Sequence, residues 1–185
     1  HLVQKLLHDR HEVHILIRPG TDQEQLEPTI VHTHLGSTQN MIDTIQDAQP
    51  DAVIHLASLF IGEHKSTEVE NLINSNVMLS TQLVEAMSVN RVGLLINVGT
   101  SWQHYADADY NPVNLYAATK QAFRSVLSFY LETSDLRVIN LEVFDTFGPN
   151  DQREKLFNLL NRLRVTGETI SMSPGNQFLD PNLAT

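Results

Sequence analysis

The sequence has no cysteine, and among its 185 residues it has only 8 glycines and 1 tryptophan. Without cysteine, neither a disulfide framework nor a thiolate metal site can form. No apolar run approaches the roughly 18 residues that a membrane-spanning helix needs, and no secretory signal is visible. We therefore expect no membrane partner and a cytoplasmic location.

Positive charge is also scarce. The chain has 12 lysines and arginines against 22 aspartates and glutamates, which gives a formal net charge of -10. Nucleic acids and anionic membranes attract basic surfaces, so this balance argues against both as partners. Hydrophobic residues make up 41% of the sequence, enough to build the core of one soluble α/β domain.

Nine histidines raise the question of a metal site. His32 and His34 would point to the same side of a strand, and His8, His11 and His14 follow one another at intervals of three. However, no His-Glu-x-x-His pattern occurs, and a change from helix to strand falls among the first three histidines. We favour solvated or core histidines over metal ligands, and we expect no metal.

Helical and strand patterns alternate along the chain. Alternating or continuous apolar patterns predict strands at residues 13–17, 29–35, 52–57, 92–98 and 138–144. Apolar residues at helical spacing predict helices up to residue 11, from Ser37 to 48, over 68–88, around Tyr116, and from 156 to an end at Gly167. This alternation indicates an α/β fold with a doubly wound parallel sheet.

Several candidate site residues directly follow predicted strands. They are Arg18, Ala57, Ser101 and Asp145. In sheets of this kind, ligands bind beyond the carboxyl ends of the strands. The agreement among these placements is more informative than any one motif.

The most informative pair is Tyr116 and Lys120, a Tyr-x-x-x-Lys pattern on a predicted helix, with Ser101 fifteen residues upstream. Residues four apart share one helix face, so a phenol and an ammonium can meet at one site. A neighbouring cation lowers the pKa of a tyrosine, and a serine hydroxyl can hold a carbonyl oxygen beside it. These groups can move a proton at an oxygen while a hydride moves at the attached carbon. The alternative interpretation is an ordinary pair on a helix surface.

With these residues assembled, the chain resembles the extended short-chain dehydrogenase/reductases, the NAD(P)-dependent epimerase/dehydratase family that acts on nucleotide sugars. The resemblance covers nearly the whole chain. Besides Tyr116 and Lys120, it rests on Asn76 and on residues 51–57 (DAVIHLA), 97–105 (NVGTSWQHY) and 144–149 (FDTFGP). It implies a Rossmann-like fold, an NAD or NADP cofactor and a nucleotide-sugar substrate.

The resemblance also assigns roles to residues. It implies that Tyr116 is the general acid or base at a sugar oxygen, that Lys120 holds the nicotinamide ribose and lowers the pKa of Tyr116, and that Ser101 binds the same oxygen. Further cofactor contacts are implied for Arg18, Leu56, Ala57 and Asn76. Substrate contacts are implied for Ser58, Trp102, Gln103 and Asp145.

Two parts of the family pattern are not found in the sequence. The glycine-rich loop that cradles a pyrophosphate, and the strand before it, would precede His1, where the chain starts on a helical pattern. Most of the substrate domain would follow Asp180. We therefore expect an internal fragment, with an NAD(P)-binding domain over residues 1–150 and the start of a substrate-binding region over 151–185. We expect this fragment to bind the dinucleotide poorly or not at all, and to be inactive by itself.

Another departure concerns the choice between NAD and NADP. Arg18 stands where NAD-preferring members carry an acidic residue for the ribose 2′-hydroxyl. A guanidinium can instead pair with a 2′-phosphate, which favours NADP. The alternative is a surface arginine in a loop. His34 takes the place of an aspartate that many relatives have near the adenine.

Trp102 and Gln103 occupy the places where the 4,6-dehydratases of the family carry Asp-Glu. Neither residue exchanges protons usefully near neutral pH, so we do not expect a 4,6-dehydratase. A 4-ketoreductase or a 4-epimerase needs only the serine, the tyrosine and the lysine. Residues 100–123 look most similar to the reductases that make CDP-3,6-dideoxyhexoses such as abequose or paratose. We expect reduction of a 4-keto-deoxyhexose, with a 4-epimerase as the alternative.

Other classes of function stay open. A non-catalytic dinucleotide sensor could use the same fold, although such regulators often lose the tyrosine or the lysine that this chain keeps. A truncated, inactive relative is a further alternative. We also expect a homodimer through the helix around residues 72–87 and the Tyr116 helix, unless their apolar faces simply pack on the sheet.

Overall fold

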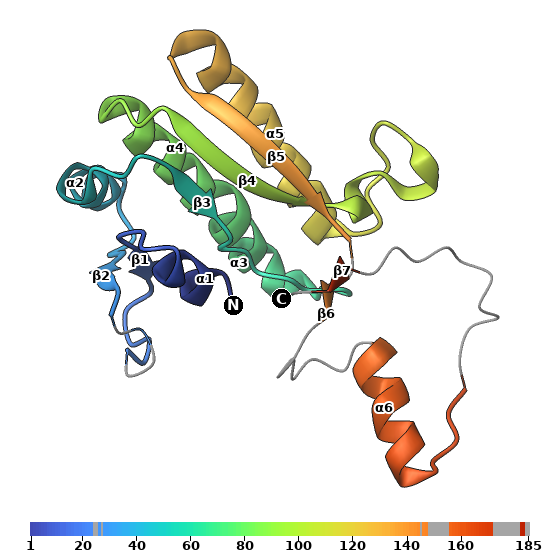
Figure 1. Cartoon of the computed structure of the whole chain (residues 1–185). Coiled ribbons are helices and arrows are strands. Elements are labelled where there is room, and N and C mark those ends of the chain that lie inside the picture. Colours follow the sequence, from blue (N-terminus) through green and yellow to red (C-terminus); the bar gives the residue numbers. More distant parts are fainter. Residues whose placement is uncertain (24–25, 27, 145, 148–155, 172–181, 184–185) are drawn as a thin grey trace. The chain divides into compact units, whose positions relative to one another are not determined.

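The computed structural model describes residues 1–185 except 24–25, 27, 145, 148–155, 172–181 and 184–185 (Figure 1). The chain forms two compact units, one from Leu2 to Glu142 and the other from His1 together with Val143–Thr185. The side chains of the candidate site that the structure describes lie in the first unit.

Strands and helices alternate in the Leu2–Glu142 unit, as the sequence pattern predicts. The strands are β1 (His14–Ile17), β2 (Ile30–Thr33), β3 (Val53–His55), β4 (Leu94–Thr100) and β5 (Arg137–Val143). The α-helices are α1 (Leu2–His8), α2 (Thr38–Ala48), α3 (Val69–Ile73), α4 (Leu79–Val89) and α5 (Leu115–Thr133). The strands and helices predicted for this unit are therefore present, with some of their ends shifted by a few residues.

The strands pair in parallel. β1 pairs with β2 in the register His14 to Ile30, and β3 pairs with β4 in the register Val53 to Leu95. β5 lies on the other side of β4, which makes β4 the central strand of a 3-stranded sheet. Parallel neighbours need a crossover connection, and here helices provide it, so the sheet confirms the predicted α/β class.

Helix α2 begins and ends at residues whose local chemistry favours these boundaries. The Oγ of Ser37 accepts a hydrogen bond from the N–H of Asn40 at 3.1 Å, which satisfies one of the free donors of the first turn. At the other end Gln49 adopts a left-handed conformation with φ 41°, and its N–H donates to the carbonyl of Ile45. The predicted start at Ser37 is confirmed.

A π-turn interrupts the helix that the sequence predicts over residues 68–88. α3 runs through a π-helical segment, η2 (Asn74–Met78), into α4, and a 3-10 turn, η1 (Ser66–Glu68), precedes α3. A π-turn widens one turn of a helix and is frequent at functional sites. This one carries Asn76, which is buried.

The core of this unit lies between the helices and the sheet. In Figure 1, α4 and α5 run along the same face of the β3–β4–β5 sheet. Alternate residues of β4 are buried, and Leu95 packs with Met87 of α4 and with Phe123 and Leu127 of α5. Burial of such side chains stabilises the fold by roughly 1.5–3 kcal/mol each. This core fixes β4 and α5 in place. The turn after β4 and the first turns of α5 carry candidate site residues, so the core also positions the site.

The second unit contains one helix and one short strand pair among its described residues. α6 (Leu156–Thr166) ends at Gly167, which has φ +71° and donates its N–H to the carbonyl of Leu163, as predicted for this helix end. β6 (Thr146–Phe147) pairs in parallel with β7 (Asn182–Leu183), a pairing that the sequence did not predict. The strand stop expected at Gly148-Pro149 lies outside the described residues.

Within the part of the chain that the structure describes, no helix is long and apolar enough to cross a membrane. Over the same residues, no group of three or more histidine, aspartate or glutamate side chains is arranged to hold a metal ion.

Candidate active site

The candidate site lies where the loops after β3 and β4 meet the start of α5. Loop 56–62 follows β3, and a 3-10 turn, η3 (Ser101–Gln103), follows β4. The ring of Phe60 touches both Trp102 and Tyr116, so these three segments are in contact. The site is thus at the carboxyl ends of two parallel strands, where ligands bind in such sheets.

The side chain of Asn114 fixes the start of α5. Its Oδ1 accepts a hydrogen bond from the N–H of Ala117 at 3.0 Å, and its Nδ2 donates to the carbonyl of Gly62 at 3.0 Å. One side chain therefore caps the helix and ties loop 56–62 to it. Tyr116 and Lys120 follow on the first turns of α5, one helical turn apart, which is the arrangement that their spacing predicts.

Tyr116 is partly buried, and its environment changes its acidity. Burial raises the pKa of Tyr116, and a hydrogen bond with Ser58 offsets part of this rise. The sequence led us to expect a lowered pKa because of Lys120. In this structure the pKa is raised instead, because removing the phenolate from water outweighs the stabilisation that its neighbours provide. The phenol therefore stays protonated at neutral pH.

Lys120 is buried, with 6% of its surface exposed. Burial lowers the pKa of Lys120 to about 8, so at neutral pH the ammonium is still the main form. Burial, followed by the charge of Lys120, lowers the pKa of His55 to about 4. His55 is therefore neutral, and Lys120 carries a buried positive charge one helical turn from Tyr116 on α5.

The protonation of His55 can be assigned from its partner. The hydroxyl of Ser80 donates to the carbonyl of Asn76 at 2.9 Å, so its oxygen accepts the 2.7 Å hydrogen bond from His55 Nε2. His55 therefore carries its proton on Nε2, and its ring packs edge to face on Phe123 of α5. This buried chain connects β3, the π-turn and α5 next to Lys120.

Asn76 joins the π-turn to loop 56–62 and to α5. Its Oδ1 accepts from the N–H of Leu59 at 2.7 Å and from Ser58 Oγ at 3.2 Å. Its Nδ2 donates to the carbonyl of Leu59 at 3.0 Å and to Thr119 Oγ1 at 2.9 Å. With 2% of its surface exposed, Asn76 acts in this structure as a clamp that positions Ser58 beside Tyr116. The predicted contact of Asn76 with a cofactor stays a prediction.

Hydrogen bonds within the turn that carries Ser101 fix its conformation. Thr100 Oγ1 accepts from the N–H of Trp102 at 3.3 Å, and Gln103 Oε1 accepts from the N–H of Thr100 at 3.0 Å. A Cβ on Gly99 would lie only 3.0 Å from the same Gln103 oxygen, which explains the glycine there. Ser101 is left partly buried at the start of the turn.

Gln103 is fully buried, and its amide is bonded within the chain. Besides the bond to Thr100, its Nε2 donates to Gln121 Oε1 at 2.8 Å. Gln103 therefore has a structural role here, because its side chain shapes the turn that carries Ser101. A substrate contact by Gln103 stays a prediction.

The remaining predicted residues lie at the border of this arrangement. Leu56 and Ala57 are exposed at the end of β3, and Leu56 shows 56% of its surface. Arg18 is exposed after β1, and its carbonyl accepts from the N–H of Thr21 at 3.2 Å. Asp145 lies outside the described residues.

His34, at the carboxyl end of β2, has a polar atom without a partner. Its Nδ1 is buried and, within the described residues, makes no hydrogen bond. Buried polar atoms normally have a partner, so this nitrogen fits a polar ligand atom, as an acceptor or a donor according to the tautomer of the ring. The family resemblance marks the same residue as a departure from the usual aspartate.

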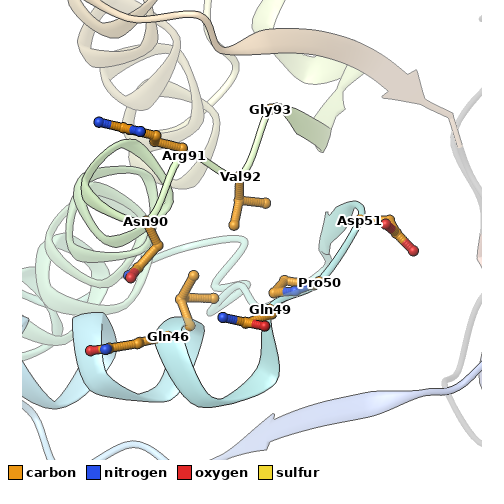
Figure 2. A pocket seen from close by; sticks show the side chains of 9 residues that line it. Gln46, Gln49, Pro50, Asp51, Asn90, Arg91, Val92 and Gly93 are labelled. Atoms are coloured by element: carbon orange, nitrogen blue, oxygen red, sulfur yellow. The ribbon is translucent and has the colours of Figure 1, made fainter.

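A polar hollow on the surface, shown in Figure 2, lies at the amino ends of β3 and β4. It is lined by residues that precede β3 and β4, among them Pro50, Asp51, Asn90 and Arg91. Because the candidate site residues follow these strands, the hollow is separate from Tyr116 and Lys120. It therefore does not contribute to the chemistry described above.

Comparison with known proteins gives one family. The model of the NAD dependent epimerase/dehydratase family matches residues 1–180. Two curated relatives are CDP-abequose synthases. The one from Yersinia pseudotuberculosis is 26% identical over 143 residues, which cover 77% of this chain and 50% of the relative. The one from Salmonella typhimurium is 22% identical over 69% of this chain and 42% of the relative. The chain thus spans about half the length of these relatives.

Solved structures share the fold. The UDP-glucose 4-epimerase of Thermus thermophilus, in complex with NAD, matches with a TM-score of 0.77 and 20% identity over 98% of this chain and 66% of that one. MoeE5, in complex with UDP-glucuronic acid and NAD, matches with a TM-score of 0.77 and 23% identity over 99% and 63%. At such identities the likeness establishes a Rossmann-like fold, which confirms the predicted fold class.

Proposed function

Because this chain belongs to the NAD dependent epimerase/dehydratase family, we propose that it is part of an enzyme that reduces the 4-keto group of a nucleotide-activated deoxyhexose. The observation that carries the proposal is the placement of Tyr116 and the buried Lys120 one helical turn apart on α5, with Ser58 hydrogen-bonded to Tyr116. The CDP-abequose synthases that it resembles support a sugar nucleotide as substrate. The absence of an Asp-Glu pair at Trp102 and Gln103 supports a reaction without elimination of water.

Reduction and epimerisation require different first steps from Tyr116. Reduction of a ketone needs an acid that delivers a proton to the new alkoxide oxygen, and a neutral phenol is ready for this step. A 4-epimerase needs the same tyrosine first as a base and later as an acid, and the resemblance to CDP-abequose synthases favours the reductase. The 4-epimerase, which would use the same three residues, is therefore our second candidate.

In this proposal Ser58 and Ser101 each provide a hydroxyl to the reaction. In the proposal Ser101 holds the substrate oxygen, and Ser58 stabilises the phenolate that Tyr116 becomes after it gives up its proton. In that step the Ser58 hydroxyl would donate to the phenolate in place of its hydrogen bond to Asn76 Oδ1, which keeps the hydrogen bond from the N–H of Leu59. Trp102 and Asp145 are the further substrate contacts that we propose from the family resemblance.

The cofactor in this proposal is NADP or NAD, bound by the region 1–150. When bound, a reduced nicotinamide supplies the hydride for carbonyl reduction. Lys120 would hold the ribose next to it, Leu56 and Ala57 would lie alongside, and His34 Nδ1 would bind a polar atom of the adenine. The exposed guanidinium of Arg18 after β1 supports a 2′-phosphate, hence NADP.

We extend the proposal to a cytoplasmic homodimer. Large apolar side chains are exposed on the helices predicted to form the interface, including Ile73 and Met78 before α4 and Leu131 on α5. Exposed patches of this kind commonly mark contacts between proteins. Light scattering gives the mass in solution, and a monomer would contradict this part of the proposal.

The experiment that tests the function is oxidation of the reduced cofactor by the full-length protein. A CDP-4-keto-6-deoxyhexose or its 3-deoxy form is supplied with NADPH or with NADH. We expect consumption, faster with NADPH. Lack of consumption with both cofactors would count against a ketoreductase, and conversion between 4-epimeric nucleotide sugars without net consumption would identify the second candidate.

A further inference from the structure

Phe60, which the sequence did not single out, stands beside Tyr116 and also contacts Trp102, which it did. The ring of Phe60 meets that of Tyr116 edge to face, with centroids 5.0 Å apart and an interplanar angle of 81°. It also meets the ring of Trp102, with centroids 5.6 Å apart at 61°. Phe60 nevertheless keeps 59% of its surface exposed. We call Phe60 and Trp102 the aromatic wall.

The backbone on both sides of Phe60 is anchored. Leu59 exchanges two hydrogen bonds with the side chain of Asn76, at 2.7 and 3.0 Å. Gly62 accepts from Asn114 Nδ2 at 3.0 Å. Phe60 therefore stands on a short, fixed stretch between the π-turn and the cap of α5. A fixed side chain loses little entropy when a ligand binds to it.

An exposed phenylalanine alone is ordinary, and α5 provides an example for comparison. Phe129 is 60% exposed and meets Tyr130 edge to face at 5.2 Å and 81°. Its exposure and its ring contact nearly match those of Phe60. The two residues differ in the ring that they contact, because Phe60 contacts Tyr116, the residue of the proposed proton transfer. The two residues therefore form a matched pair for experiment.

The position of the aromatic wall limits which sugars fit. If the carbonyl oxygen at C4 lies at the hydroxyl of Tyr116, the substituents on C3 and C5 lie among the groups that surround Tyr116. In a 3,6-dideoxyhexose, C3 is a methylene and C5 carries a methyl group. Such groups pack favourably on aromatic rings, whereas a hydroxyl that faces the rings of Phe60 and Trp102 would lose hydrogen bonds to water, and the rings cannot replace them.

We propose that Phe60, together with Trp102, is a specificity determinant that selects nucleotide sugars deoxygenated at C3 and C6. The inference rests on the proposed function, since it needs the C4 oxygen at Tyr116. The inference is narrower than the proposed function, because it assigns the selection of the sugar to an apolar surface and to Phe60, a residue outside the catalytic group. An apolar site discriminates such small differences by about tenfold to a few hundredfold.

The test compares two sugars on the same nucleotide, so that contributions of base and phosphates cancel. Calorimetric titration of the full-length protein with NADP⁺ gives the Kd of a CDP-3,6-dideoxyhexose and of CDP-glucose. The variants are Phe60→Asn, Phe60→Leu and the matched control Phe129→Leu. Light scattering on each variant checks that the oligomeric state is unchanged.

We expect wild type and Phe129→Leu to bind the dideoxy sugar at least about tenfold more tightly than CDP-glucose. Phe60→Asn should bring the two Kd values to within about threefold, and Phe60→Leu should retain an intermediate preference because its side chain is apolar. An unchanged ratio in Phe60→Asn, or an equal loss of affinity for both sugars, would overturn the inference and leave the proposed function intact. If wild type bound neither sugar, both the inference and the proposed function would be wrong.

Discussion

At the scale of single residues, Tyr116 has a distinct task in this account: it gives one proton to the ketone oxygen. Its ring packs against Phe60, and this contact does not need the phenolic oxygen. Tyr116→Phe should therefore lower kcat by about 10²–10⁴-fold, the usual contribution of a general acid, with little change in Kd for cofactor and sugar nucleotide. Single-turnover kinetics and calorimetric titration measure the two quantities. Equal turnover in the variant would remove Tyr116 from the mechanism.

Lys120 provides a second test, because the charge that serves catalysis is unfavourable for folding. Its folded-state pKa is lowered by burial to about 8 from 10.5. Lys120→Met, which fills similar volume without charge, should abolish turnover and raise the free energy of unfolding by about 1–3 kcal/mol.

The lowered pKa of Lys120 determines how the stability of the wild-type protein should change with pH. Between the folded pKa of about 8 and the unfolded value of 10.5, the unfolded chain binds more protons, so the stability of the wild-type protein rises with pH in this window. Urea unfolding at several pH values should show this rise in wild type and a smaller one in Lys120→Met. A variant that is less stable than wild type at neutral pH would contradict the assignment of burial as the cause.

At the scale of elements, the π-turn and α5 are coupled through Asn76. Its amide makes four hydrogen bonds, to Leu59 twice, to Ser58 and to Thr119. Asn76→Ala should lower the free energy of unfolding by about 2–3 kcal/mol because buried polar partners are left unsatisfied. Asn74→Ala, an exposed asparagine in the same π-turn, is the matched control and should cost much less.

Measurements of activity can show whether Asn76 acts on Tyr116 through Ser58 or has only a structural role. Because Asn76 positions Ser58 beside Tyr116, its loss should shift the acid-base profile of kcat to higher pH, in the direction of a further raised pKa of Tyr116. Stopped-flow rates over pH measure this shift. A stable variant with an unchanged profile would mean that Asn76 does not act through Ser58.

The elements were largely predictable from the sequence, and the reasons are local. Apolar periodicity located the strands and helices, and the cap at Ser37 and the end at Gly167 depend on nearby residues. The π-turn was not predicted, because Asn76 is bonded to residues 17 and 43 positions away in the sequence. Likewise, Phe60 lies in a loop without periodicity, and only the fold brings it to Tyr116.

At the candidate site, the raised pKa of Tyr116 is a further property that the sequence could not predict. The Tyr-x-x-x-Lys spacing correctly predicted that the two side chains would follow each other on one helix. It could not predict how far each group would be removed from water, and desolvation decides the direction of both pKa shifts.

At the scale of the whole molecule, stability should fall in mild acid because of His55. Burial, with a contribution from Lys120, lowers the folded pKa of His55 to about 4 from 6.5. Between these values the unfolded chain binds more protons, so stability decreases as pH falls through 6.5 toward 4. From neutral pH to about pH 5, His55 alone should remove about 2 kcal/mol from the free energy of unfolding.

A His55→Gln variant tests this assignment, since its amide can still donate to Ser80. Its stability should decrease less than that of wild type over the same pH range, as measured by urea unfolding. Parallel pH dependence in the two proteins would show that another group is responsible.

The central claim is that hydride and proton are delivered to one sugar carbonyl in a site built around Tyr116. The most direct measurement uses NADPH with deuterium at its transferable position, a CDP-4-keto-deoxyhexose and the full-length protein. Mass spectrometry of the recovered sugar nucleotide should find one deuterium at C4 with wild type and almost none with Tyr116→Phe in the same time. A sugar recovered without label from the wild-type protein, or labelled equally by both proteins, would contradict the account.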